Sequence, residues 1–156
     1  MTAFRQAGYD DLTQFAQMRW DFRTEEEHQP PLMSREEFVR ECVAFLRQGL
    51  EHHSWTYWVA EQDGLLVSHV FVHRILKVPS PFDLSGRFGY VTNVYTRPEH
   101  RNQGVGSALL ERVLEWARQE DLETLIVWPS EASIPFYKRA GFTSRNDVLE
   151  LQLHEE

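Results

Sequence analysis

The sequence predicts a mixed α/β fold of the α+β type, in which a mostly antiparallel central sheet carries helices on both faces and includes one strand-helix-strand crossover. Two patterns predict this architecture. Residues 54–96 have the composition of extended strands interrupted by short polar turns, as in an antiparallel sheet. A long amphipathic helix then leads into a short, mainly apolar segment, which is typical of a buried parallel strand. The expected order of elements is β-α-α-β-β-β-α-β-α-β.

Length and composition set the class of protein. A chain of 156 residues with 42% hydrophobic content is expected to form a single domain over residues 1–156. Its net charge of −8 disfavours nucleic acid and anionic membranes as partners and is compatible with a cationic acceptor. Cys42 is the only cysteine, and no Cys/His spacing indicates a metal. Without a recognisable signal peptide or membrane span, the protein is expected to be cytoplasmic.

The chain is expected to begin with a strand and a helix. Residues 4–7 favour a short strand that ends at Gly8. The acidic pair at positions 10–11 places negative charge where a helix N-terminus is positive, so a helix is expected to begin there. The polar segment 24–33 contains Pro-Pro and predicts a loop. Glu25–Glu27 are expected to form a solvated turn, with a substrate-attracting rim as the alternative.

A capping box predicts the second helix. Ser34 stands at the N-cap position and Glu37 three residues later, the arrangement in which both side chains satisfy free backbone N–H groups. The apolar pattern continues to Gln48, and Gly49 is expected to end the helix.

A β-hairpin and a further strand are expected next. The segments Trp55–Glu61 and Leu65–Val78 are strand-like and flank Asp63-Gly64, a dipeptide typical of tight hairpin turns. After a proline-containing loop, residues 88–96 predict another strand, which ends at Arg97-Pro98.

The last third of the chain completes the crossover. Residues 123–128 predict a buried parallel strand. A helix is expected to begin between Ser130 and Pro135, because proline is tolerated only in a first turn, and to end at Gly141. Residues 148–153 alternate apolar and polar side chains and predict a final strand at the sheet margin.

The loop after the strand at 88–96 has the features of an anion-binding site. Arg101, Gly104 and Gly106 form an R-x-x-G-x-G pattern directly before a helix. The first N–H groups of a helix lack intrahelical partners and lie at the positive end of its dipole, so they bind phosphate oxygens. The glycines remove β-carbons that would obstruct such contact. The pattern matches neither a Walker A loop nor the dinucleotide fingerprint, and by itself it also fits a plain glycine turn.

A second motif follows at a characteristic distance. Residues 136–142 read F-Y-x-x-x-G-F and close the last helix. The chain resembles the GNAT superfamily of acyl-CoA-dependent N-acyltransferases over essentially its whole length. The resemblance rests on three features in this order: R-x-x-G-x-G, a strand about twenty residues later, and the aromatic motif. The resemblance implies a GNAT-like fold and a transferase with acetyl-CoA as co-substrate, an amine-bearing acceptor and no metal.

The resemblance also implies a site. The acceptor amine would attack the thioester directly, without an acyl-enzyme, a strand N–H near Val94 would stabilise the oxyanion, and Tyr137 would protonate the departing thiolate. Pantetheine would pair with the strand backbone, and the pyrophosphate would lie on amides 102–107. The implied cofactor-binding residues are Val94, Tyr95, Thr96, Arg101, Asn102, Gln103, Gly104, Val105, Gly106, Ser107, Ser130 and Ser133.

The general base stays open. Many family members carry a carboxylate on the strand at 88–96, but this strand has no Asp or Glu and offers Asn93 instead. Asn93 is therefore the second catalytic candidate, as a holder of a water chain, and His69 and His73 are alternatives. Family members often place Asn seven residues before the tyrosine, where this chain has Ser130.

The expected function is transfer of an acetyl group to a primary amine of a small molecule or a peptide N-terminus. The rival hypothesis is a non-catalytic acyl-CoA-binding or regulatory module of the same fold, favoured by the missing carboxylate. A general nucleotide-phosphate binder is a third. The acceptor is left open, and so is the choice between monomer and homodimer, since many family members are dimers.

Overall fold

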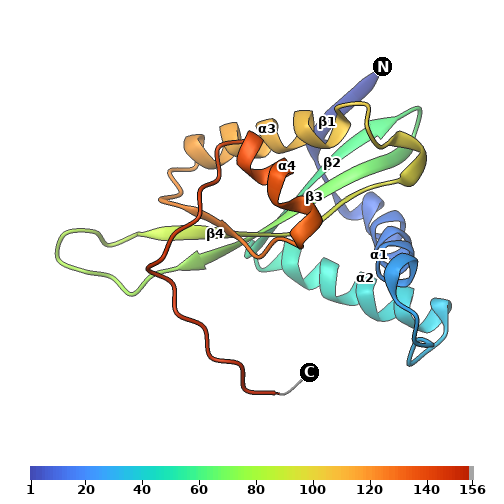
Figure 1. The fold of residues 1–156 in the computed structure, drawn as a ribbon, viewed down its shortest axis with the longest axis horizontal. Helices are drawn as coiled ribbons and strands as arrows, with labels where there is room; N and C mark the ends of the chain where they lie inside the picture. Colours follow the sequence, from blue (N-terminus) through green and yellow to red (C-terminus); the bar gives the residue numbers. More distant parts are fainter. Residues whose placement is uncertain (155–156) are drawn as a thin grey trace.

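The structure is a computed structural model that describes residues 1–154 (Figure 1). Its strands are β1 (Thr2–Gln6), β2 (Trp55–Gln62), β3 (Leu65–Leu76), β4 (Arg87–Thr96) and β5 (Leu125–Val127). Its α-helices are α1 (Leu12–Glu26), α2 (Arg35–Glu51), α3 (Val105–Gln119) and α4 (Ile134–Arg139). Short 3₁₀ turns stand before three of the helices. They are η1 (Tyr9–Asp11) before α1, η2 (Pro98–His100) before the loop that leads into α3, and η3 (Glu131–Ser133) before α4.

The five strands form one sheet in the order β1-β2-β3-β4-β5. Neighbouring strands are antiparallel except β4 and β5, which are parallel and joined through α3. Helices α1 and α2 cover one face of the sheet, and α3 and α4 cover the other (Figure 1). The predicted mixed fold with one crossover is therefore confirmed.

Each face of the sheet has its own apolar core. On the α1 and α2 face, Phe15 and Tyr57 are buried with their neighbours from β2 and β3. On the α3 face, Leu109, Leu110 and Val113 are fully buried against the opposite side of the same strands. Burying one such aliphatic side chain contributes about 1.5–3 kcal/mol, so both faces hold the sheet in place.

Helix α2 confirms Ser34 as the N-cap and corrects the predicted end of the helix. The Ser34 hydroxyl accepts from the backbone N–H of Glu37 at 3.2 Å. The helix continues past Gly49 to Glu51. A β-carbon on Gly49 would lie 2.3 Å from the Tyr57 hydroxyl, so this glycine lets the helix approach β2 and does not end it.

Two turns match their local sequence signals. Asp63 and Gly64 have φ angles of 51° and 81°, the left-handed values of a two-residue hairpin turn. Gly141 has a φ of 108°, and the backbone N–H of Phe142 donates to the carbonyl of Tyr137 at 3.1 Å. The glycine stop of α4 is therefore confirmed.

The predicted strand at 148–153 is wrong. This part of the chain runs outside the sheet without regular structure, and Val148, Leu149, Leu151 and Leu153 are exposed (Figure 1). Alternation indicates which side chains share a face, but a strand also needs a neighbour to pair with. Strand β5, which ends the sheet order, is three residues long and offers a short edge. None of the helices in residues 1–154 is both long and apolar enough to span a bilayer.

Candidate active site

The site begins where β4 parts from β5. The two strands pair only from Gly89 with Leu125 to Val91 with Val127. Strand β4 continues to Thr96, so its last five residues have no partner on the β5 side. Backbone groups along an unpaired edge can bond to an extended ligand, as an added strand would.

A β-bulge in β4 coincides with this separation. Phe71 of β3 pairs with Thr92, whereas His69 pairs with Tyr95, so one residue of β3 stands opposite two of β4. Asn93 lies in this bulge with a left-handed φ of 51°, which is uncommon for a residue other than glycine. A bulge bends a strand and increases its twist, and here it turns the end of β4 away from β5.

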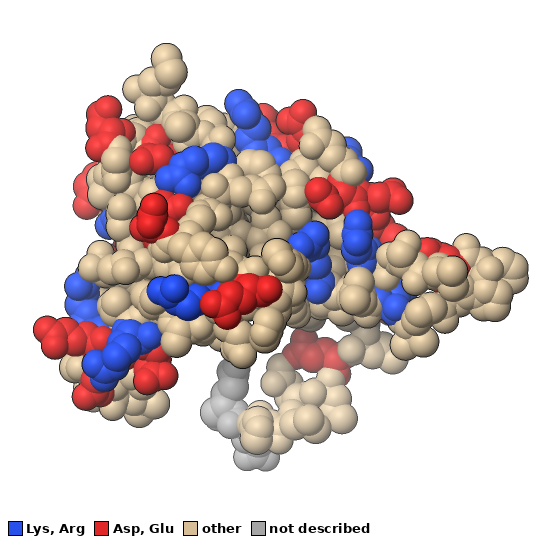
Figure 2. All heavy atoms as spheres, turned by 180° about the vertical axis from the view of Figure 1, so that it is seen from behind, with Lys and Arg blue, Asp and Glu red and all other residues tan. Residues whose placement is uncertain are grey.

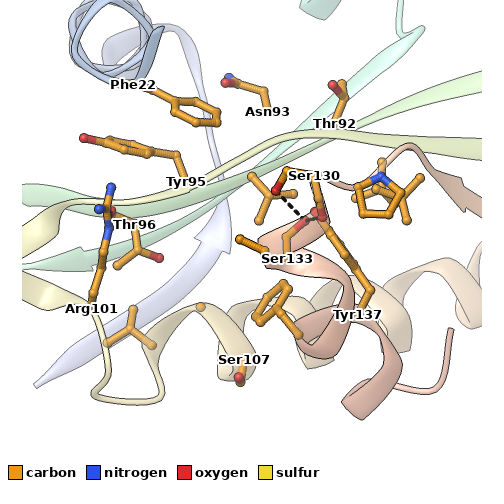
Figure 3. A pocket seen from close by; sticks show the side chains of 18 of the residues that line it. Phe22, Thr92, Asn93, Tyr95, Thr96, Arg101, Ser107, Ser130, Ser133 and Tyr137 are labelled. Atoms are coloured by element: carbon orange, nitrogen blue, oxygen red, sulfur yellow. Dashed lines mark hydrogen bonds between the residues drawn. The ribbon is translucent and has the colours of Figure 1, made fainter. Parts of the chain in front are cut away.

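A cavity of about 820 Å³ opens between the parted strands. Of the predicted site residues, only Gln103 does not line it; the Gln103 amide instead donates to the Glu99 carbonyl at 3.1 Å. The predicted residues that do line the cavity are Asn93, Val94, Tyr95, Thr96, Arg101, Asn102, Gly104, Val105, Gly106, Ser107, Ser130, Ser133 and Tyr137. Three separate segments of the chain therefore meet in one space (Figure 3).

The N-terminus of α3 forms one wall. Gly104 precedes the helix with a left-handed φ of 79°, and a β-carbon there would meet no atom within 4 Å. The amides of Val105, Gly106 and Ser107 are the first of the helix, and the first turn contains no acidic residue. The positive end of the helix dipole is thus left for an anionic ligand.

Arg101 is partly engaged by the protein itself. Its Nε donates to the Thr96 carbonyl at 2.9 Å, and its Nη2 donates to Glu25 at 2.9 Å. Glu25 also accepts from the Tyr95 hydroxyl at 2.9 Å. Partial burial raises the pKa of the Glu25 carboxyl group, but the hydrogen bonds from Arg101 and Tyr95 together outweigh it and lower that pKa. The loop predicted at 24–33 begins later than expected, because α1 continues to Glu26 and so contains Glu25. Glu25 is exposed overall, but its carboxylate joins α1 to the loop before α3 and does not face solvent alone.

Tyr137 reaches the cavity from α4. Its side chain is 6% exposed and packs against Phe136 and Phe142. Burial raises the pKa of its phenol to about 12, so the hydroxyl keeps its proton at neutral pH. Beside it, the Ser130 hydroxyl donates to that of Ser133 at 3.0 Å (Figure 3).

Neither histidine alternative lines the cavity. His69 is fully buried among Phe15, Phe71 and Tyr95, and burial lowers its pKa to about 4. Its Nδ1 donates to the Asn93 carbonyl at 2.7 Å, which ties the bulge to β3. His73 is half-buried and stacks on Trp55, which packs against the same core.

Sequence reasoning missed the contribution of α1. Arg19, Phe22 and Arg23 line the cavity, and Arg19 donates to the Asn93 side chain at 3.0 Å. The available signal was their spacing of three and four residues, which places them on one helix face. The cavity lining found in residues 1–154 contains no Asp or Glu, and those residues hold no cluster of three or more candidate metal ligands.

Comparison with known proteins identifies the family. Residues 12–142 match the acetyltransferase (GNAT) family. The chain belongs to the GNAT acetyltransferase family. This confirms the resemblance drawn from R-x-x-G-x-G and the aromatic motif of α4.

Individual GNAT relatives agree with that assignment. Glucosamine 6-phosphate N-acetyltransferase of Trypanosoma brucei brucei is 30% identical over 98 residues, covering 56% of this chain and 67% of the relative. A predicted acetyltransferase of Clostridium acetobutylicum, crystallised with acetyl-CoA, is 25% identical with a TM-score of 0.80, covering 98% of this chain and 97% of its own. A GCN5-related N-acetyltransferase of Ralstonia eutropha, 22% identical with a TM-score of 0.73 over 99% and 100% of the two chains, shares the fold.

Proposed function

We propose that this GNAT protein transfers the acetyl group of acetyl-CoA directly to a primary amine. The observation that carries the proposal is the unpaired end of β4, which lies in one cavity with the first amides of α3 and the phenol of Tyr137. A solved GNAT structure similar over 98% of this chain was crystallised with acetyl-CoA, which supports the same ligand here.

The cavity residues fit the parts of acetyl-CoA. Amides of Val105, Gly106 and Ser107 suit a diphosphate, because no β-carbon at Gly104 and no carboxylate in the first turn obstructs it. The free edge of β4 at Val94–Thr96 suits the pantetheine amides, which carry alternating donors and acceptors as a peptide does.

The groups that line the cavity would support direct transfer of the acetyl group from acetyl-CoA to the amine. Bound acetyl-CoA supplies a thioester carbonyl that an amine can attack. A backbone N–H near Val94 would stabilise the charge that develops on the carbonyl oxygen, which is worth about 3 kcal/mol at comparable sites. Cys42 does not line the cavity, and burial raises the pKa of its thiol. A cysteine acyl-enzyme therefore has no support.

The Tyr137 hydroxyl would act on the departing sulfur. The pKa of the Tyr137 phenol, about 12, lies above the value of about 8.5 for a thiol. Transfer of the phenol proton to the thiolate is therefore unfavourable unless the phenol oxygen takes up another proton at the same time. The attacking nitrogen must lose one proton while the sulfur gains one, so the phenol can donate to sulfur as it accepts from the nitrogen side. The proton count is then balanced.

The first proton of the ammonium form would leave through water. No carboxylate lines the cavity formed by residues 1–154, and neither His69 nor His73 lines it. Asn93 Oδ1 accepts from Arg19 and has a second lone pair for a water molecule. Activity should therefore rise with pH until the free amine predominates, following the pKa of the acceptor itself.

The test is a panel of primary amines incubated with acetyl-CoA, with free thiol and acetylated product both measured. Stoichiometric formation of the two products supports the proposal. Acetyl-CoA binding without product for any amine would favour the non-catalytic module, and competition by ATP as strong as that by CoA would favour a general phosphate binder. Product formed through a radiolabelled acetyl group that remains on the protein would contradict direct transfer.

A further inference from the structure

The cavity differs in charge from the protein as a whole. The chain has a net charge of −8, and its outer surface mixes acidic and basic side chains on the face shown in Figure 2. The cavity lining known from residues 1–154 contains four arginines and no acidic residue. These arginines are Arg19, Arg23, Arg101 and Arg139. A cavity so lined favours anionic ligands.

The four arginines fall into two groups. Arg101 and Arg139 belong to the loop before α3 and to α4, on the side of the proposed diphosphate site. Arg19 and Arg23 belong to α1, which covers the opposite face of the sheet. Phe22, between them in sequence, lies across β4 from Ser107 (Figure 3). The α1 pair is therefore available to a different ligand.

Neither α1 arginine is neutralised by the protein. No carboxylate of residues 1–154 comes within 4.0 Å of Arg19 or Arg23. The nearby acids are engaged elsewhere. Asp21 lies 3.8 Å from Arg35 and 3.9 Å from Arg97, and Glu25 pairs with Arg101 at 2.9 Å.

Arg19 is held in a defined position. It is partly buried, its Nη1 donates to Asn93, and its guanidinium lies 5.8 Å from the ring centroid of Phe22. Burial and the charge of Arg23 lower its pKa. Two like charges four residues apart destabilise a helix, so the pair costs stability unless an anion lies against it.

We propose that Arg19 and Arg23 bind an anionic group, a phosphate or a carboxylate, on the same acceptor molecule that carries the reacting amine. This inference rests on the proposed acetyl transfer and specifies its substrate class as an anionic primary amine. Guanidinium groups offer paired N–H donors that match phosphate and carboxylate oxygens. Because Arg19 contacts Asn93, an anion held here would place the rest of the acceptor beside the open end of β4. The cavity thus does not favour the cationic acceptor that the acidic composition suggested.

Matched pairs of amines test the inference. Glucosamine 6-phosphate is compared with glucosamine for a phosphate, and alanine with alaninamide for a carboxylate. We expect kcat/KM for the anionic member of at least one pair to exceed that of its neutral partner by about tenfold or more. Arg23→Gln should abolish this preference while leaving turnover of the neutral amine and the Kd of CoA nearly unchanged. Arg19→Gln should also abolish the preference, but it is expected to slow the neutral amine as well, because Arg19 holds Asn93. Arg118→Gln, an exposed arginine in the last turn of α3, is the matched control.

Equal use of both members of each pair, or a preference that survives both substitutions, would overturn the inference while leaving the acetyl transfer intact. A loss of CoA binding in Arg23→Gln would also overturn it, because the arginines would then serve the cofactor. Calorimetric titration of the same four amines provides a readout without turnover. If an anionic amine binds in an arginine-dependent way but is not acetylated, the anion site is supported and the transfer is refuted. If none of the four amines binds and none is acetylated, both the anion site and the transfer are overturned.

Discussion

The two halves of β4 differ in how they are bonded, although they belong to one strand. Residues 89–91 are paired on both edges, and a β-carbon on Gly89 would lie 2.6 Å from Leu125 and 2.9 Å from Val72. Residues 92–96 are paired on one edge, contain the bulge at Asn93 and line the cavity. The difference separates stability from binding along a single strand, so substitutions at the two halves should have opposite consequences.

The largest expected effect concerns the residue that faces the open half. Tyr137→Phe removes the hydroxyl that would donate to the departing sulfur, and a positioned acid contributes about 10²- to 10⁴-fold to rate. We expect kcat to fall by about 100-fold or more, with the Kd of acetyl-CoA nearly unchanged. Steady-state kinetics and calorimetry measure the two quantities. If the substitution weakened acetyl-CoA binding and left kcat intact, Tyr137 would be a packing residue only.

A substitution in the paired half should do the reverse. Gly89→Val places methyl groups where Leu125 and Val72 leave no room, and overpacking costs about 1–3 kcal/mol of unfolding free energy. Urea denaturation should show this loss, while the folded fraction keeps its kcat. Gly8→Ala is the control, because a β-carbon there meets nothing within 4 Å. Equal stability of the two variants would contradict the close approach of β4 and β5.

His69, which donates a hydrogen bond to the bulge at Asn93, should make the stability of the fold depend on pH. The pKa of His69 is lowered from its ordinary value of 6.5 to about 4. At a pH between these two values, His69 is therefore protonated in the unfolded chain but not in the folded chain. Its contribution is complete above pH 6.5 and is lost as the pH falls toward 4, by about 2 kcal/mol between pH 8 and pH 5. Urea denaturation at both pH values should show this loss, with a smaller one in His69→Gln. An exposed control, His28→Gln, should retain the wild-type difference, and a wild-type slope in His69→Gln would refute the assignment.

The smallest effect is expected where α1 meets the cofactor loop. Glu25→Gln removes the carboxylate that pairs with Arg101, and such a partly exposed ion pair contributes less than about 1 kcal/mol to stability. Because Arg101 is then free to face a phosphate, the affinity for CoA should rise by a few-fold at low ionic strength. Calorimetric titration with CoA measures this affinity, and Glu26→Gln, which makes the same change in charge, is the control. A weaker affinity specific to Glu25→Gln would mean that the ion pair shapes the site.

The fold was predictable where a few adjacent residues determine the backbone. Ser34 with Glu37, Asp63-Gly64 and Gly141 each satisfy a local backbone requirement, and all three appear as expected. The strand expected at 148–153 failed because its side-chain alternation carries no information about a partner strand. Gly49 was misread because the close approach of Tyr57 is a tertiary contact.

The same distinction applies to the site. The glycines before α3 and the aromatic motif of α4 are sequence signals, and the residues that they indicated line the cavity, with the exception of Gln103. Arg19 and Arg23 were not predictable, since only the packing of α1 over β4 brings them beside Asn93. The left-handed Asn93 likewise depends on the pairing of β4 with β3 and on the bond from His69.

Hydrogen–deuterium exchange with and without acetyl-CoA tests most directly whether the open end of β4 and the first turn of α3 receive the cofactor. We predict slower amide exchange at residues 92–96 and 105–107 on addition of acetyl-CoA, with little change at residues 89–91, which already lie between two paired strands. Unchanged exchange in both of the first two segments at a saturating concentration, with protection elsewhere, would contradict the account.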